Sequence, residues 1–234
     1  MGVSTENIGA VLFDMDGLLL DSEPLWAEVI HALCVTRGAS YTEADSAICR
    51  GRGVDTTVRY LSAAKGFPLA VEGDLALIEA AFVAAVPRAP YCVGAEALLR
   101  SLAGRVPVAL GSSSPRHIVE AALRGRGALS LFDAVVTGSD VARRKPAPDI
   151  FLECARQLRV DPSRCLVLED SVAGCEAASA AGMRVLGVLP EPDAALRAAA
   201  SEVFPNLVTV AGLLGGISAI APVPASATGA HLDT

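Results

Sequence analysis

The sequence predicts an α/β protein, with a doubly wound parallel sheet and a small helical cap domain inserted after the first strand. Short apolar runs alternate with helical patterns along most of the 234 residues, which is typical of parallel strands joined by helices. With 52% apolar but only 4% aromatic residues, the composition favours helices packed on buried strands over an aromatic-rich sandwich. One early stretch with helical patterns but no strand breaks the alternation and predicts the insertion.

Five apolar runs predict the strands of the sheet, at residues 8–13, 106–110, 134–137, 165–168 and 185–189. The helical patterns between them cover residues 95–102, 115–124, 149–158 and 173–181, and Gly182 is the expected C-cap of the last helix. Ligands of such sheets bind at the carboxyl ends of the strands. Polar residues follow most of these runs, so we expect the functional site at this edge.

The inserted segment carries helical patterns at residues 23–35, 54–64 and 74–86. We predict a Rossmann-like core domain of residues 1–21 and 89–219, a helical cap domain of residues 22–88 that could serve as a lid, and a loose tail of residues 220–234. The uncharged stretch 207–230 is long enough to cross a bilayer, but glycine and proline residues interrupt it. We expect a short strand, a final helix and part of the tail there.

Charge and cysteine content limit the partners and the compartment. The formal charge is −7 and no long basic run offsets it, which argues against nucleic acid or an anionic membrane as a partner. Six cysteines without a C-x-x-C pair, and no signal-peptide pattern, predict reduced thiols in the cytoplasm. A monomer is the simplest expectation.

Two carboxylates stand close together after the first predicted strand. Asp14 and Asp16 are two residues apart, and Gly17 permits a tight turn. Such neighbouring charges are unfavourable unless a cation or a shared proton relieves them, and Mg²⁺ suits a site with few carboxylates. The alternative is a D-x-D turn that is simply solvated.

Further strand ends carry a hydroxyl, an ammonium and two more acids. Ser112 and the amides of the next helix could bind a phosphate, although Ser114 equally suits a helix N-cap. Lys145 could hold a counter-charge over the site or belong to a solvated basic cluster. Glu169 and Asp170 could reach a metal or cap a helix. Together these elements are more specific than any one alone, because all lie at one predicted sheet edge.

At these residues the chain resembles the haloacid dehalogenase-like hydrolase superfamily, specifically its capped sugar-phosphate phosphatases and β-phosphoglucomutases. The resemblance runs from about Ile8 to Val210 and rests on F-D-M-D-G-L-L-L-D-S-E-P-L-W at 13–26, G-S-S-S-P at 111–115, K-P-A-P-D at 145–149 and L-E-D-S-V-A-G at 168–174. It implies an Mg²⁺-dependent phosphatase acting on a small phosphorylated metabolite, most simply a sugar or polyol phosphate, through an aspartyl-phosphate.

The resemblance also implies the roles of single residues. Asp14 would be the nucleophile and Asp16 the general acid and base. The phosphate or substrate would be bound by Ser112, Ser113, Lys145 and Arg52. Mg²⁺ would be coordinated by Asp14, the backbone carbonyl of Asp16, Asp170 and Glu169, the last directly or through a water.

Three alternatives stay open. A β-phosphoglucomutase would return the phosphoryl group to the sugar; its pattern has an arginine where this chain has Val54, although Arg52 lies close by. A phospho-aspartate signalling receiver and a catalytically silent binding protein are more remote. The side chains that set specificity could include Arg50, Arg52, Asp55, Trp26 and Arg116, and His117 could border the mouth of the site.

Overall fold

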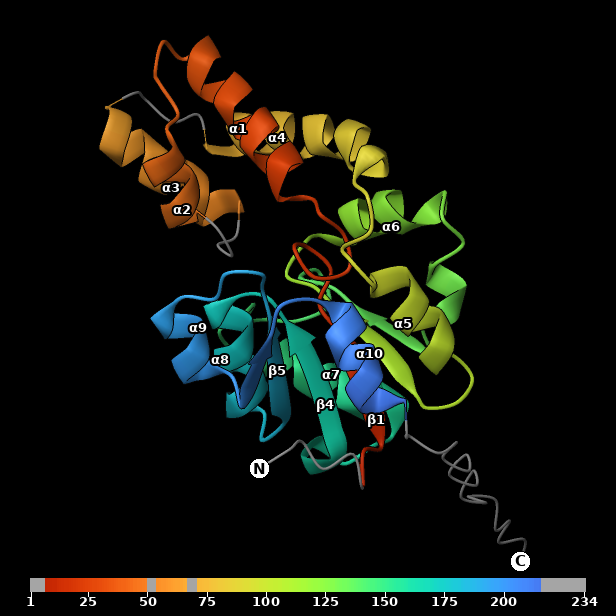
Figure 1. Cartoon of the computed structure of the whole chain (residues 1–234). Helices are drawn as coiled ribbons and strands as arrows, with labels where there is room; N and C mark the ends of the chain where they lie inside the picture. The colour runs from red at the N-terminus through yellow and green to blue at the C-terminus, as the bar shows by residue number, and fades with distance from the viewer. Residues whose placement is uncertain (1–6, 50–53, 67–70, 216–234) are drawn as a thin grey trace, which may run out of the picture.

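The computed structural model describes residues 7–49, 54–66 and 71–215, and its centre is a parallel sheet with helices on both faces (Figure 1). In the described residues the sheet has six strands in the order β3-β2-β1-β4-β5-β6. Each neighbouring pair is parallel. This arrangement confirms the predicted fold class. The strands are β1 (Ala10–Phe13), β2 (Val108–Gly111), β3 (Ala134–Val136), β4 (Cys165–Glu169), β5 (Arg184–Val188) and β6 (Glu202–Phe204).

Alternate side chains of each strand enter two separate hydrophobic cores. Val11 and Phe13 of β1 belong to one core, whereas Ala10 and Leu12 belong to the other. Both faces of the sheet are covered, so each strand needs apolar residues at consecutive positions and shows no alternation of apolar and polar residues. The first core includes residues of α5 (Ala95–Leu102), α6 (Arg116–Arg124) and α10 (Leu207–Leu214), and the second includes residues of α7 (Asp149–Leu158), α8 (Val172–Ala180) and α9 (Ala194–Ala199).

The helices between β1 and α5 gather beyond the carboxyl edge of the sheet (Figure 1). Trp26 stacks on Phe82 with ring centroids 3.4 Å apart, which packs the first of these helices on the last. The short second helix was not predicted. These helices are α1 (Glu23–Thr36), α2 (Glu43–Cys49), α3 (Val54–Lys65) and α4 (Val71–Ala85), followed by the 3₁₀ turn Val86–Arg88.

The two connections between these helices and the sheet run side by side. Leu20 and Tyr91 form an antiparallel bridge. The amide of Asp21 donates to the carbonyl of Pro90 at 2.9 Å, and the amide of Cys92 donates to the carbonyl of Leu19 at 3.0 Å. The chain therefore leaves the sheet and returns to it at adjacent points.

The C-terminal part differs from the prediction. The uncharged stretch begins with helix α10, not with a strand, because Leu207, Val210 and Leu214 recur at helical spacing and are buried. Asn206 caps this helix by accepting from the amide of Thr209 at 3.1 Å. The strand is β6, which precedes it, and α9 was not predicted. Among the described residues no helix has the length and apolarity to cross a membrane. The predicted tail, 220–234, lies outside them.

Candidate active site

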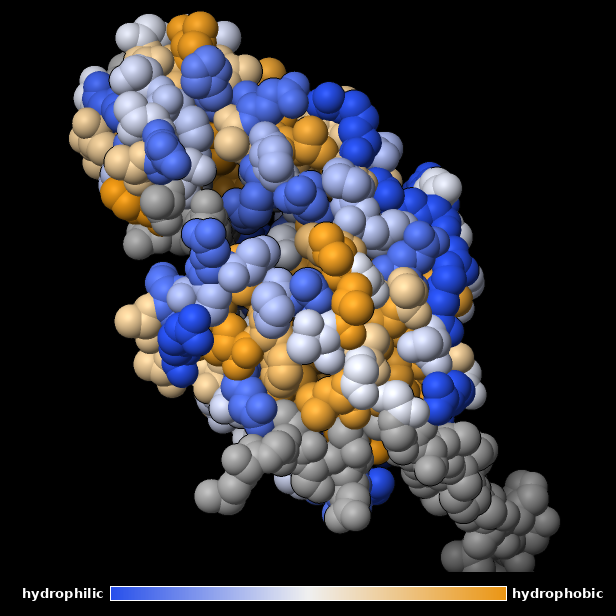
Figure 2. All heavy atoms as spheres, in the orientation of Figure 1, coloured by the Kyte–Doolittle hydropathy of each residue, from blue (hydrophilic) through white to orange (hydrophobic). Residues whose placement is uncertain are grey.

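A cleft of about 560 Å³ lies between the carboxyl edge of the sheet and helices α1–α4. Figure 2 shows a hollow at this position, bordered by hydrophilic side chains. Residues from four predicted strand ends meet in it, as the sequence led us to expect. They are Asp14 and Asp16 after β1, Ser112 and Ser113 after β2, Lys145 after β3, and Glu169 and Asp170 at the end of β4.

Lys145 is the centre of the polar network. Its Nζ lies 2.5 Å from Oδ1 of Asp14, 2.6 Å from Oε1 of Glu169 and 2.8 Å from the carbonyl oxygen of Gly111. These three acceptors use all three protons of an ammonium group. Burial lowers the pKa of Lys145, but the two carboxylates outweigh it and raise that pKa above its usual value. The side chain is only 5% exposed and remains a cation.

Three acids lie together beside this ammonium. Oxygen atoms of Asp14, Glu169 and Asp170 all lie within 4.8 Å of one another. Burial raises the pKa values of Asp14 and Asp170 well above their usual range, and the neighbouring carboxylates raise both further, whereas Lys145 lowers both. When all three acids are ionised, they and the one ammonium leave an excess of two negative charges, which a bound cation would relieve. The donor set therefore fits a divalent, oxygen-preferring cation such as Mg²⁺.

Two glycines leave the space that these acids occupy. Gly17 has φ +85°, and a Cβ there would lie 2.1 Å from Oδ2 of Asp170. A Cβ on Gly174, in the first turn of α8, would lie 1.7 Å from Oε1 of Glu169. Any larger residue would displace a carboxylate from the cluster.

Ser171 caps helix α8, so neither preceding acid is needed as its N-cap. Oγ of Ser171 accepts from the amide of Gly174 at 3.0 Å. The amide and hydroxyl of Ser171 both donate to Oε2 of Glu169, at 3.0 and 2.9 Å. Both oxygens of Glu169 are thus engaged, one by Ser171 and the other by Lys145. This leaves Asp14 and Asp170 as the acids best able to face a cation.

The carboxylate of Asp16 is held apart from the acid cluster by three donors. Oδ1 accepts from Oγ of Ser22 at 2.6 Å and from Nε1 of Trp26 at 3.4 Å. Oδ2 accepts from Oγ of Ser114 at 2.8 Å. Sequence reasoning missed Ser22 and Ser114 as partners of Asp16, because no sequence spacing reveals which hydroxyls a folded loop brings together.

The serine loop after β2 is anchored by backbone contacts. The amide of Ser112 donates to the carbonyl of Val136 at 3.0 Å, and its buried hydroxyl accepts from the amide of Ser114 at 3.0 Å. Ser113 lines the cleft. The suggestion that Ser114 caps a helix is wrong: α6 starts after Pro115 without a side-chain cap, and the Ser114 hydroxyl bonds to Asp16 instead.

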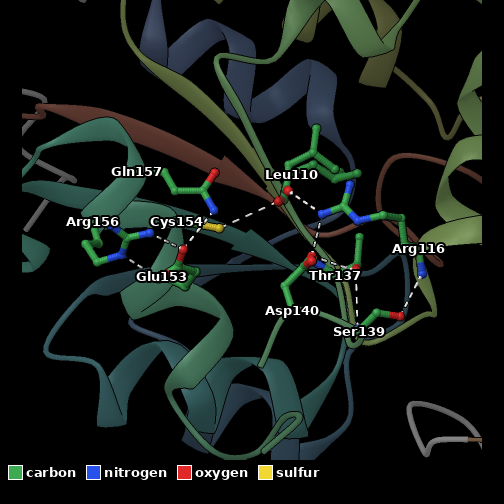
Figure 3. Close-up of polar contacts among 10 residues, drawn as sticks. Leu110, Arg116, Thr137, Ser139, Asp140, Glu153, Cys154, Arg156 and Gln157 are labelled. Atoms are coloured by element: carbon green, nitrogen blue, oxygen red, sulfur yellow. Dashed lines mark hydrogen bonds and ion pairs between the residues drawn. The ribbon is translucent and has the colours of Figure 1, made fainter. Parts of the chain in front are cut away.

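Several candidate specificity residues have other partners. Arg116 donates to Oδ2 of Asp140 at 2.6 Å (Figure 3) and is not among the residues that line the cleft. His117 is 54% exposed and lies 3.4 Å from the carboxylate of Glu79, which does line the cleft. Asp55 and Trp26 also line it. Arg50 and Arg52 lie outside the described residues.

Comparisons with known proteins agree on one family. The model of the haloacid dehalogenase-like hydrolases matches residues 8–182. Fructose-1-phosphate phosphatase from Escherichia coli (strain K12) is 33% identical over 196 residues, which are 78% of this chain and 97% of that protein. Hexitol phosphatase B from the same organism is 34% identical over 189 residues, 79% of this chain and 85% of that protein.

A solved structure is similar over nearly the whole chain. It is a HAD family hydrolase from Deinococcus radiodurans R1, crystallised with bound phosphate and sodium. The TM-score is 0.72 at 33% sequence identity, and the superposition covers 92% of this chain and 99% of that one.

Proposed function

Because the chain belongs to the haloacid dehalogenase-like hydrolases and is a phosphoric monoester hydrolase, we propose that it removes phosphate from a sugar or polyol phosphate. The reaction passes through a phosphorylated Asp14. The observation that carries the proposal is the buried contact of Lys145 with Asp14 and Glu169, next to Asp170 at the floor of the cleft. A carboxylate, a buried ammonium and three acids that could bind a metal lie together there, which supports the proposal.

The first half of the reaction transfers the phosphoryl group to the protein. A carboxylate oxygen of Asp14 attacks phosphorus in line with the departing oxygen, and the bond between phosphorus and that oxygen breaks. Asp16, in its protonated form, gives its proton to the departing oxygen, so the product leaves as an alcohol. The positive charge of Lys145 stabilises the phosphoryl oxygens during the transfer.

The second half releases the phosphate. Asp16, now a carboxylate, takes a proton from a water molecule while that water attacks phosphorus. The bond from phosphorus to Asp14 breaks, inorganic phosphate leaves, and both aspartates return to their initial state. Splitting one slow hydrolysis into two displacements lowers the barrier of each.

Asp14, Asp170 and the backbone carbonyl of Asp16 would hold Mg²⁺, with Glu169 bound directly or through a water. When bound, the ion would neutralise the excess negative charge of the cluster and the charge of the phosphate. Ser112, Ser113 and the amides that follow Asp14 and Ser112 would bind phosphate oxygens. The assignment of Arg52 to substrate binding stays a prediction, because this residue lies outside the described part of the chain.

The cleft suits the rest of a small substrate. Its volume falls in the range of sites for small molecules. Tyr41, Asp55 and Glu79 line the walls and can accept hydrogen bonds from the hydroxyl groups of a sugar or polyol. Val54, which stands where the resemblance to β-phosphoglucomutases would need an arginine, begins α3 and also lines the cleft. An uncharged residue at this place favours hydrolysis over return of the phosphoryl group.

The test is phosphate release from hexose, hexitol and nucleotide phosphates, with Mg²⁺ or with EDTA. We expect metal-dependent release that is highest with a hexose or hexitol phosphate and is abolished in Asp14→Asn, which keeps the shape of the side chain. Rapid acid quenching during turnover should show protein that has gained the mass of one phosphoryl group on the peptide containing Asp14.

The matched control is Asp161→Asn, an exposed helix cap remote from the cleft, where asparagine can still accept the hydrogen bond from the amide of Ser163. It should keep wild-type activity. Conversion of β-glucose 1-phosphate to glucose 6-phosphate without net phosphate release would mean that the protein is a mutase. Absence of any phosphorylated peptide in a working enzyme would contradict the covalent route.

A further inference from the structure

We propose that Ser114 is a positioning residue whose hydroxyl orients the carboxyl group of Asp16 for proton transfer to the departing oxygen. This inference rests on the proposed function, because it assigns Ser114 a part in the acid step. Ser114 is not among the residues predicted to act in catalysis or to bind a ligand. From the sequence it suited a helix cap.

The two oxygens of Asp16 are held from opposite parts of the chain. Oδ1 contacts Ser22 and Trp26, at the N-terminal end of α1, whereas Oδ2 accepts from Ser114 in the loop after β2, at 2.8 Å. Ser114 and Asp16 are 98 residues apart in the chain. Only the fold brings this donor to the second oxygen.

Contacts on both oxygens matter because the terminal torsion of an aspartate is soft. Rotation about the Cβ–Cγ bond has broad energy wells, so a donor on one oxygen alone leaves the plane of the carboxyl group poorly defined. Donors on both oxygens fix that plane. A general acid must present its proton within hydrogen-bonding reach of the departing oxygen, so the orientation of the plane affects the rate.

Ser114 is itself held firmly enough to serve this purpose. Its amide donates to the hydroxyl of Ser112 at 3.0 Å, and its carbonyl accepts from the amide of Gly138 at 3.0 Å. A Cβ on Gly138 would lie 2.3 Å from the carbonyl oxygen of Ser113, so glycine lets the two loops approach. The Ser114 hydroxyl therefore links the expected phosphate-binding loop to the acid.

The loss of this hydroxyl should depend on the leaving group. A sugar or alkyl oxygen departs as a strong base and needs the proton from Asp16 as its bond to phosphorus breaks, whereas p-nitrophenolate is stable without one. Phenyl phosphate has nearly the same shape as p-nitrophenyl phosphate but a more basic leaving oxygen. Disturbed proton donation should therefore affect phenyl phosphate more than p-nitrophenyl phosphate.

The experiment compares wild type, Ser114→Ala and Ser114→Thr with Mg²⁺, using kcat/KM because it reports steps up to the first phosphoryl transfer. For Ser114→Ala we expect a loss of about 10- to 100-fold on a hexitol phosphate and on phenyl phosphate. This is at most the lower end of the roughly 10²- to 10⁴-fold that general acid catalysis contributes, because Asp16 itself is retained. The loss on p-nitrophenyl phosphate should stay below about 3-fold, and on the hexitol phosphate kcat should fall more than KM changes. Ser114→Thr keeps a hydroxyl and should recover most of the activity.

The control is Ser46→Ala, which removes another hydroxyl that lines the cleft on α2. It should leave the ratio of the two aryl activities unchanged. Equal losses of Ser114→Ala on both aryl phosphates, or no loss on the hexitol phosphate, would overturn the positioning role. A wild-type protein that hydrolyses no phosphomonoester would instead refute the proposed function.

Discussion

Replacing Gly17 with alanine should push the carboxylate of Asp170 away from Asp14 and Glu169 while leaving the fold intact. The new Cβ would lie 2.1 Å from Oδ2 of Asp170, whereas ordinary contact begins at about 3.4 Å, so the carboxylate must move away by about 1.3 Å. A displacement of about 1 Å at a catalytic site can reduce the rate about 100-fold. Each tenfold is worth about 1.4 kcal/mol, so this loss corresponds to about 2.8 kcal/mol in the activation barrier.

Gly104 provides the matched control. It has φ +75°, close to the +85° of Gly17, but a Cβ there meets nothing within 4 Å. Alanine in such a left-handed conformation costs roughly 1–2 kcal/mol, so both variants should lose at least this much stability in urea unfolding. Only Gly17→Ala should also lose activity.

The assay is phosphate release as a function of Mg²⁺ concentration. We expect Gly17→Ala to need more Mg²⁺ for half-maximal rate and to reach about a hundredth of the wild-type maximum, while Gly104→Ala follows the wild type. If the two variants have the same Mg²⁺ dependence and maximum, the position of the Asp170 carboxylate is not critical, and the assigned metal site is wrong.

Three other perturbations test separate parts of the structure. Gly174→Ala places a Cβ 1.7 Å from Oε1 of Glu169, so we expect at least a tenfold loss of phosphatase activity, although alanine normally stabilises a helix. A variant as active as the wild type, or more active, would contradict this. Lys145→Met leaves buried carboxylates without their cation, so urea unfolding in EDTA should show a loss of about 3 kcal/mol, and unchanged stability would be evidence against the network. The hydrogen bond from Lys65 lowers the pKa of Asp45 from 3.8 to about 2, so the stability from this pair is present above about pH 4 and is lost as the pH falls towards 2. Urea unfolding across this range should show a smaller acid loss in Asp45→Asn than in wild type.

The sequence supplied the sheet and most of the candidate site because both depend on local signals. Apolar runs marked the strands that became β1–β5, and polar residues directly after them marked the carboxyl edge. The helices α2 and α9 are seven and six residues long, and β6 has three residues. Helices this short contain too few turns for a periodic signal. β6 is no shorter than β3, but it is half-buried and begins with Glu202, so no apolar run marks it.

Contacts between distant loops could not be predicted in the same way. Lys145 was expected near the site, but its contact with the carbonyl of Gly111 depends on how the loops after β2 and β3 pack. The bond from Ser114 to Asp16 depends in the same way on the relative placement of two loops. The sequence pattern around Ser114 suits a helix cap equally well, and only tertiary structure decides between the two.

The paired connections at Leu20 and Tyr91 have a consequence for how such proteins diversify. Because the chain departs from and rejoins the sheet at neighbouring points, a change of length in the helices between them need not shift the register of the strands. The candidate site lies at the ends of β1–β4, whereas helices α1–α4 supply much of the wall of the cleft. Changes confined to these helices are therefore a route by which selection could replace one substrate with another while the strand ends stay the same.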